Sequence, residues 1–308
     1  MTLKKTIQYV KDKIQRPKKI KSMNEAQKSK KFWTDHNVTL HHLFKSTRES
    51  IDYLSWRNNQ YVDYIKYLPN IGHDKEVIVD YGCGPGHDLI GFFNQSKPKK
   101  VYGIDVSKTS LAEAKNRLRL HRYKCDLIQI SEDEHKIPID NESVDYIHCS
   151  GVLNHVSSPE IVTKEFFRIL KPGGYARFMV YNYDSIWVHL YVAHILPLKD
   201  ERYASLSKED AFTRSTDGFD CPISRNWSIN EFLELGVKSG FKAKHLGNAV
   251  SLYEMSLLPQ RFEPLMDSKF DKESQDFLQK ITIDERGVPY VNGLAAGIDG
   301  CFEWRKTK

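Results

Sequence analysis

A short β-branched run that closes on three alternating glycines constrains this chain more than any other feature. Residues 77–81 read Val-Ile-Val-Asp-Tyr, and Gly82, Gly84 and Gly86 follow at every second position. The run has the composition of a buried parallel strand. Glycines after such a strand let the backbone turn sharply and approach a ligand that any Cβ would exclude. We therefore expect a ligand-binding loop directly after a buried strand, although a simple tight turn is the alternative.

An acidic residue lies one helix and one strand further along. The pattern predicts a helix over residues 87–94 and a strand over 100–104, and Asp105 ends that strand. In dinucleotide-binding folds a carboxylate at this place accepts hydrogen bonds from the ribose hydroxyls. The glycine loop and Asp105 together predict a pocket for a cofactor that contains a nucleoside.

Strand and helix patterns continue to alternate through the middle of the chain. They predict a helix over 108–119, strands over 125–130 and 144–149, a helix over 159–170 and a strand over 175–181. A capping box at 228–231 begins a further helix that ends at residue 239, and strand patterns follow at 241–247 and 297–305. This alternation is typical of a doubly wound α/β fold with a mostly parallel sheet.

At these residues the chain resembles the class I S-adenosylmethionine (SAM)-dependent methyltransferases, in particular the methyltransferase-11-like group. The GxGxG spacing, Asp80 two residues before the first glycine, Asp105, and the turn Lys171-Pro172-Gly173-Gly174 carry the resemblance. It covers residues 76–180 well and 228–249 more loosely. The resemblance implies a seven-stranded sheet with an antiparallel hairpin at one edge.

The same resemblance implies SAM as the cofactor and gives each loop a role. Asp80 would hold the ammonium group of SAM, Asp105 its ribose, Val106 a face of its adenine, and Asp133 the adenine amino group. A solvated acidic loop is the alternative for the segment around Asp133. The full set of expected cofactor-binding residues is Asp80, Gly82, Gly84, Gly86, Asp105, Val106, Asp133 and Ser150.

Methyl transfer from a sulfonium is an in-line displacement, which mainly requires alignment of the acceptor and exclusion of water. An oxygen or nitrogen acceptor with a high pKa also needs a general base. The resemblance places His155 close to the methyl group, and we take His155 and Asp217 as the candidate catalytic residues. His189 and His194 are further candidates, and a purely structural role remains open for each histidine.

The acceptor is expected beyond the other half of the sheet's carboxyl edge, because the cofactor would occupy the first half. The insertion over residues 182–227 begins there and is rich in Tyr, His and Arg. Tyr183 is predicted to stack on the acceptor, and Arg214 and Arg225 are predicted to bind a carboxylate or phosphate on it. An ordinary surface connection is the alternative for this insertion.

The length of 308 residues predicts one domain with additions. We expect a flexible basic tail over 1–31, a helical cap over 32–70, and a SAM-binding domain over 71–308 with insertions at 182–227 and 252–296. The tail holds 11 of the 46 basic residues and 2 of the 40 acidic ones, so the rest of the chain is slightly acidic. A solvated helix would explain such a tail, and so would binding to RNA, anionic lipid or an acidic glycan.

Five scattered cysteines without a CxxC motif predict neither disulfides nor a zinc site. The histidines form no HExxH motif, so no metal is expected. The apolar stretch over 186–198 is too short to cross a bilayer, and the first residues lack the apolar core of a signal peptide. A cytoplasmic protein without a transmembrane segment is the expectation.

These features together predict a SAM-dependent methyltransferase that acts on oxygen of a small-molecule or glycan-like acceptor. An RNA methyltransferase is the first alternative; the basic tail favours it, but the Asn/Asp-Pro-Pro-Tyr motif of base-methylating enzymes is absent after residues 144–149. A nonenzymatic SAM-binding scaffold is the second. A nicotinamide dehydrogenase is disfavoured because its loop would read GxGxxG.

Overall fold

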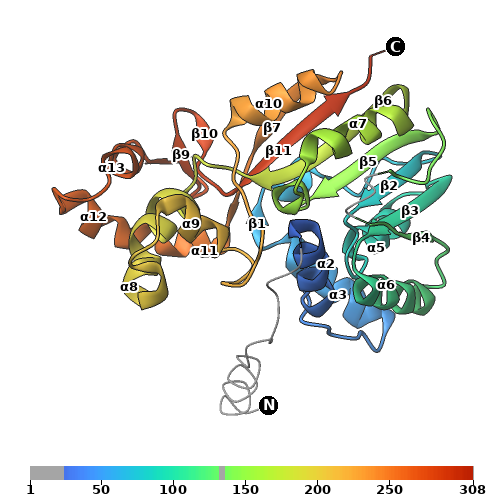
Figure 1. The fold of residues 1–308 in the computed structure, drawn as a ribbon, viewed down its shortest axis with the longest axis horizontal. Helices are drawn as coiled ribbons and strands as arrows, with labels where there is room; N and C mark the ends of the chain where they lie inside the picture. The colour runs from blue at the N-terminus through green and yellow to red at the C-terminus, as the bar shows by residue number, and fades with distance from the viewer. Residues whose placement is uncertain (1–23, 132–135, 308) are drawn as a thin grey trace.

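The alternating pattern folds into a central sheet of eight strands in a computed structural model that describes residues 24–131 and 136–307 (Figure 1). In spatial order the strands are β1 (Tyr61–Val62), β7 (Lys242–Ser251), β11 (Asp299–Arg305), β6 (Leu170–Tyr181), β5 (Val144–Ser150), β2 (Val77–Tyr81), β3 (Lys100–Asp105) and β4 (Asp126–Gln129). Strands β6, β5, β2, β3 and β4 are parallel. Strand β11 runs antiparallel between β6 and β7, which confirms the predicted edge hairpin.

Helices cover both faces of this sheet. Four of them come after parallel strands in the chain: α5 (His87–Gln95), α6 (Lys108–His121), α7 (Pro159–Ile169) and, after the first insertion, α10 (Ile229–Lys238). Alternate residues of β2 enter two different cores: Val79 packs in the cluster that contains Phe166 of α7, and Ile78 packs in the cluster that contains Leu89 of α5. Both faces of β2 are therefore buried, as the continuous apolar run predicts.

The chain reverses its winding direction between β2 and β5. From β2 the sheet grows through β3 to β4 on one side, and from β5 it grows through β6 on the other. Ligands bind beyond the carboxyl ends of the strands at such a switch point in open α/β sheets. The loops after β2, β3 and β5 therefore meet at one place.

The N-terminal cap contains α2 (Glu25–Asp35), α3 (Thr47–Asn58), α4 (Tyr64–Tyr67) and strand β1. Helix α2 begins with a capping box between Asn24 and Gln27, so the predicted boundary at residue 31 lies inside a helix. Residues 1–23 lie outside the described part. The all-helical prediction for the cap was wrong at β1, because Tyr61 and Val62 pair antiparallel with β7 and add an eighth strand.

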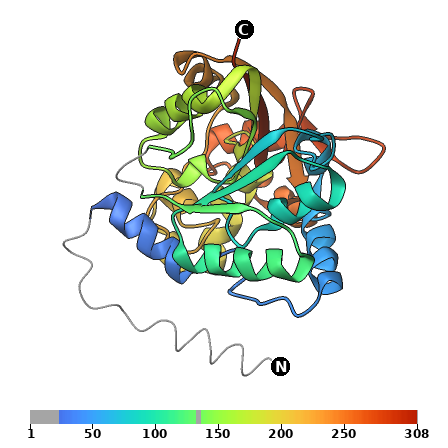
Figure 2. The ribbon, with the colours of Figure 1, turned by 90° about the vertical axis from the view of Figure 1, so that its right-hand side faces the viewer.

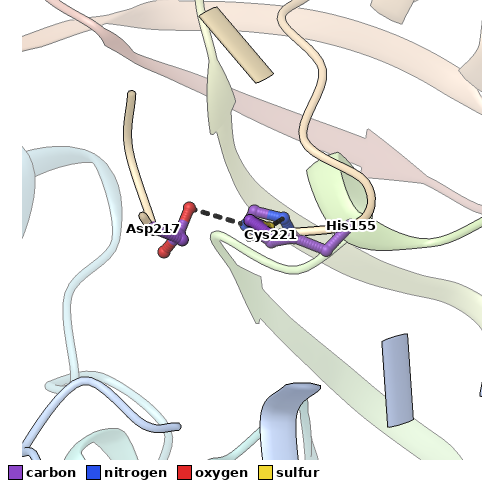
Figure 3. A group of neighbouring side chains, drawn as sticks. All are labelled: His155, Asp217 and Cys221. Atoms are coloured by element: carbon purple, nitrogen blue, oxygen red, sulfur yellow. Dashed lines mark hydrogen bonds and ion pairs between the residues drawn. The ribbon is translucent and has the colours of Figure 1, made fainter. Parts of the chain in front are cut away.

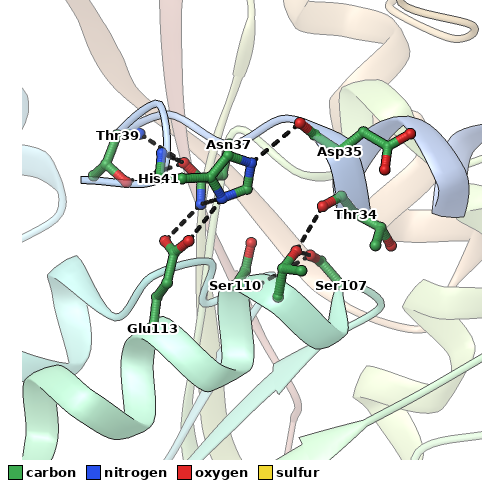
Figure 4. A network of polar contacts seen from close by, with 9 residues as sticks. Thr34, Asp35, Asn37, Thr39, His41, Ser107, Ser110 and Glu113 are labelled. Atoms are coloured by element: carbon green, nitrogen blue, oxygen red, sulfur yellow. Dashed lines mark hydrogen bonds and ion pairs between the residues drawn. The ribbon is translucent and has the colours of Figure 1, made fainter. Parts of the chain in front are cut away.

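The segment after α2 is fastened to α6 by a polar network (Figure 4). Glu113 of α6 accepts a hydrogen bond at 2.7 Å from Asn37 and lies 2.7 Å from Nδ1 of His41. Thr109 donates to the backbone carbonyl of Thr34 at 2.6 Å. These contacts hold the cap against the helix that follows Asp105, at the cofactor side of the sheet edge.

The two insertions pack on each other and form an accessory layer at one end of the sheet (Figures 1 and 2). The first contains the π-helix η2 (Trp187–Ile195), α8 (Leu196–Lys199), η3 (Glu201–Tyr203) and α9 (Lys208–Thr213). The second contains α11 (Leu252–Leu257), η4 (Leu258–Arg261), α12 (Phe262–Met266), α13 (Lys272–Gln279) and the small sheet of β8 (Thr282–Ile283), β9 (Pro289–Val291) and β10 (Leu294–Ala295). Across the described residues, no helix has the length and apolar content to cross a membrane.

Candidate active site

A cavity of about 830 Å³ opens at the carboxyl edge of the central strands. Residues at the ends of β2, β3 and β5 form its floor, and the cap helices α2 and α3 and the accessory layer form its walls. The cavity therefore lies at the switch point, where the strand order predicts a ligand site.

The glycine loop is shaped by three different requirements. Gly82 and Gly84 line the cavity. A Cβ on Gly82 would lie 2.2 Å from a methyl carbon of Val152, whereas a Cβ on Gly84 would meet no heavy atom within 4 Å. Gly86 does not line the cavity; it caps α5 with φ +81°, and a Cβ there would lie 3.3 Å from Cβ of Ala114. The prediction that Gly86 contacts the cofactor is thus corrected, because its missing side chain serves helix packing.

Asp105 braces the glycine loop from the end of β3. One carboxylate oxygen accepts a hydrogen bond from the backbone N–H of Gly84 at 2.8 Å, and the other accepts from that of Ser107 at 2.7 Å. Burial raises the pKa of Asp105, although these backbone hydrogen bonds oppose the shift. Asp105 and Val106 both line the cavity. Asp133 lies outside the described residues.

Asp80 presents a buried carboxylate to the same cavity. Its side chain is 3% exposed, and its Oδ2 has no hydrogen-bond partner within the described ranges. Burial, and then the neighbouring Asp88, hold the pKa of Asp80 well above its ordinary value. A cationic donor would satisfy this oxygen, so the site fits the ammonium group of SAM.

The sequence gives no signal for Arg57, a cap residue that also lines the cavity. Its guanidinium forms an ion pair with Asp88 at the start of α5. Next to it, the hydroxyl groups of Tyr64 and Ser150 lie 2.7 Å apart, and both residues line the cavity. Arg57 places a fixed positive charge near the buried Asp80, where a cofactor with both an ammonium and a carboxylate group would lie.

His155 and Asp217, the predicted catalytic pair, lie together in the cavity wall although 62 positions separate them in the chain (Figure 3). Nδ1 of His155 lies 2.7 Å from the carbonyl oxygen of Ile223, and a carbonyl can only accept, so Nδ1 carries a hydrogen. Nε2 lies 3.4 Å from the carboxylate of Asp217. The Tyr181 hydroxyl donates to the same carboxylate oxygen at 3.2 Å. Asp217 is thus held in place to stabilise a positive charge on the imidazole ring.

Cys221 completes a trio with His155 and Asp217 whose potential metal-ligating atoms lie within 4.8 Å of one another. Its sulfur lies 3.9 Å from Nδ1 of His155, which already donates to a carbonyl. Burial raises the pKa of the Cys221 thiol to about 12, so the protonated form dominates at neutral pH. To use these atoms, a metal ion would have to displace the thiol proton of Cys221 and the hydrogen bond from Nδ1 of His155 to the Ile223 carbonyl.

The three residues predicted to bind the acceptor do not line the cavity. Arg214 donates to the carbonyl of Phe219 at 3.1 Å, and Arg225 donates to that of Val156 at 2.9 Å. The Tyr183 hydroxyl donates to Glu273 at 2.6 Å, outside the cavity. The prediction of an anion-binding loop is therefore corrected, since both guanidinium groups serve the backbone of the insertion and its neighbour.

Around His155 and Asp217, the cavity is instead lined by aromatic rings and one further acid. Asp299, at the start of β11, is 2% exposed, and its Oδ2 lacks a hydrogen-bond partner in the part of the chain described. Burial, followed by nearby Glu254, holds the pKa of Asp299 well above its ordinary value. The aromatic residues at this side are Trp33, Tyr61, Tyr64, Tyr181, Trp187 and Tyr253. They come from six elements, α2, β1, α4, β6, η2 and α11, so their convergence on one wall depends on the tertiary fold.

The other candidate bases lie elsewhere. His189 is buried in the accessory layer, where its Nδ1 lies 3.0 Å from the hydroxyl of Ser274. His194 lies 3.4 Å from Glu263. Neither residue lines the cavity, so His155 is the remaining candidate of the three.

A family described as a methyltransferase domain matches residues 72–222. The chain is 32% identical to an uncharacterised transposon protein of Streptomyces fradiae over 54% of this chain and 43% of that protein. It is 28% identical to malonyl-[acyl-carrier protein] O-methyltransferase of Marinomonas sp. over 51% of this chain and 62% of the relative. The chain thus spans roughly half the length of these curated relatives.

Among solved structures, the chain is similar to geranyl diphosphate C-methyltransferase from Streptomyces coelicolor. The alignment has a TM-score of 0.51 at 15% sequence identity and covers 94% of this chain and 100% of that one. At this identity the likeness concerns the fold, and it confirms the predicted α/β architecture.

Proposed function

The chain belongs to the class I SAM-dependent methyltransferases, and from this premise we propose that the protein transfers a methyl group from SAM to an oxygen atom of a small-molecule acceptor. Asp80 and Arg57 would hold the methionine end of SAM, Gly84 would leave room for it, and Asp105 would hold the ribose. SAM supplies an electrophilic methyl group on a positively charged sulfur. The residues of this chain must then orient the acceptor and take its proton.

The pairing of His155 with Asp217 is the observation that carries the proposal. Because Nδ1 of His155 donates to the Ile223 carbonyl, Nε2 is the ring nitrogen that can accept a proton from an acceptor hydroxyl in the cavity. The imidazolium that results would lie 3.4 Å from the Asp217 carboxylate, which Tyr181 holds by its hydrogen bond. Removal of the proton leaves an oxygen anion that attacks the methyl group more readily.

The lining of the acceptor side indicates which molecules would fit. Asp217 and Asp299 are acidic, the surrounding side chains are aromatic, and the one arginine of the described lining is paired with Asp88. An anionic acceptor would meet two carboxylates there and no unpaired guanidinium. We therefore infer an acceptor that is neutral or cationic, with hydroxyl or amine donors and an apolar or aromatic body. A glycan-like acceptor with an exposed sugar face remains compatible with these walls.

Turnover assays with point variants test the proposal. Labelled SAM would first be incubated with fractionated cell extract to identify the acceptor, and the product would be analysed for O-methylation. His155→Gln should lower kcat by roughly 100-fold or more with unchanged affinity for S-adenosylhomocysteine, the demethylated product of SAM. Tyr183→Phe, outside the cavity, is the matched control and should leave kcat unchanged.

Two outcomes would contradict the proposal. Full activity of His155→Gln would show that the imidazole of His155 takes no part in the reaction. Tight S-adenosylhomocysteine binding without turnover of any fraction would favour a nonenzymatic SAM-binding role, and a labelled RNA product would favour the RNA methyltransferase.

A further inference from the structure

A second cavity, of about 320 Å³, lies in the accessory layer. Helix η2 contributes to both cavities: Trp187 lines the candidate active site, whereas His189 lines the second cavity. Helix α13 and the small sheet supply other parts of its wall, including Phe277 and Leu294. The methyl transfer proposed above uses none of its residues.

The hydrogen bonds around His189 fix which ring nitrogen carries its hydrogen. Ser274 donates its hydroxyl hydrogen to the carboxylate of Asp271 at 2.6 Å, because a carboxylate can only accept. The Ser274 oxygen, 3.0 Å from Nδ1 of His189, must therefore accept from that nitrogen. Nδ1 carries the hydrogen, and Nε2 of the neutral ring presents a lone pair.

This lone pair is buried and unused. His189 is 1% exposed, and Nε2 has no hydrogen-bond partner among residues 24–131 and 136–307. Burial, and then the charge of Lys208, lower the pKa of His189 to about 4, so the ring stays neutral at physiological pH. A buried acceptor without a donor costs free energy, which a ligand with an N–H or O–H group would recover.

Asp184 adds a negative charge to the same cavity. Glu273 is paired with Lys208 at 2.7 Å and Asp276 with Lys272 at 2.7 Å, whereas Asp184 makes no ion pair in the described structure. Although Asp184 is largely exposed to solvent, partial burial of its carboxyl group, and then repulsion by Glu273, raise its pKa. A positively charged ligand group would relieve this repulsion.

We propose that the second cavity binds a small primary amine in its protonated form, with the ammonium group between the Asp184 carboxylate and Nε2 of His189. An ammonium group has three donors and a positive charge, so one group satisfies both partners. The apolar side chains of Ile229, Phe277, Val291 and Leu294 line the rest of the cavity and suit a short hydrocarbon chain. Lys280 also lines the cavity and is exposed, so it disfavours a second positive charge on the ligand.

Three probes of the same size and different charge test this proposal on the unaltered protein: butylammonium, butan-1-ol and butyrate. Binding is followed by the ring C–H resonances of His189 in NMR spectra, which are assigned by their loss in His189→Phe. Butylammonium should shift these resonances at millimolar concentration, butan-1-ol should bind at least roughly tenfold more weakly, and butyrate should cause no shift. Equal affinities for the three probes would overturn the proposal.

Matched carboxamide variants locate the ammonium group. Asp184→Asn should weaken butylammonium binding by roughly tenfold or more, whereas Asp276→Asn, whose carboxylate is already paired with a lysine, should change it by less than about twofold. Equal effects of the two variants would refute the assigned position. Since binding is read without SAM and without turnover, failure here leaves the methyltransferase proposal untouched, and the reverse also holds.

Discussion

Replacement of Gly84 by alanine should weaken cofactor binding strongly and lower the stability of the fold only slightly. Gly84 has φ +50°, a left-handed conformation that costs an L-residue about 1 kcal/mol. Its added Cβ would meet no protein atom within 4 Å, so the fold should tolerate the change apart from this backbone cost. The same Cβ would project into the cavity, next to the backbone N–H that Asp105 holds.

The expected loss of cofactor affinity follows from overpacking. One extra carbon in a filled site typically costs about 1 to 3 kcal/mol. This corresponds to a rise of roughly five- to 150-fold in the Kd for S-adenosylhomocysteine. Calorimetric titration measures this Kd, and urea unfolding measures the accompanying loss of about 1 kcal/mol in stability.

Gly287→Ala is the matched control. Gly287 has φ +79°, and its Cβ would also meet nothing within 4 Å, but it lies in the turn before β9 and does not line the cavity. Both variants should lose similar stability, and only Gly84→Ala should lose affinity. Wild-type affinity in Gly84→Ala, or an equal loss in Gly287→Ala, would refute the argument that the glycine loop faces the cofactor.

Three further variants have defined expectations. Asp105→Ala should weaken S-adenosylhomocysteine binding at least roughly tenfold and lower Tm, because the N–H groups of Gly84 and Ser107 lose their acceptor; unchanged calorimetric affinity would exclude the ribose role. Asp299→Asn should raise Tm at pH 8, because an acid with a raised folded pKa loses its stabilising contribution as the pH rises through that pKa; a lower Tm at pH 8 would contradict this. In His189→Phe, the free energy of unfolding should depend less on pH under acidic conditions than it does in the wild type. The folded pKa of about 4 lies below the unfolded value near 6.5, so the wild type should lose about 3 kcal/mol between these pH values, and parallel urea-unfolding profiles would disprove it.

Local patterns predicted most of the sheet because its strands are determined by short apolar runs. Strand β2, the glycine loop and α5 occur where the run at 77–81, the glycines and the helical periodicity predict them. Longer-range pairing was harder to read: Tyr61 and Val62 sit among aromatic residues with helical spacing, yet they pair with the end of β7. The Lys-rich composition before residue 31 likewise concealed the capping box of α2.

The sequence by itself therefore determined the α/β fold and the cofactor loop, since both depend on residues close together in the chain. Tertiary structure decided how the acceptor side is built. It brought His155 to Asp217, placed Arg57 beside Asp88, and directed Arg214 to a backbone carbonyl rather than into the cavity. These outcomes depend on the path of the cap and insertions, where each polar side chain takes whichever buried partner the packing leaves within reach.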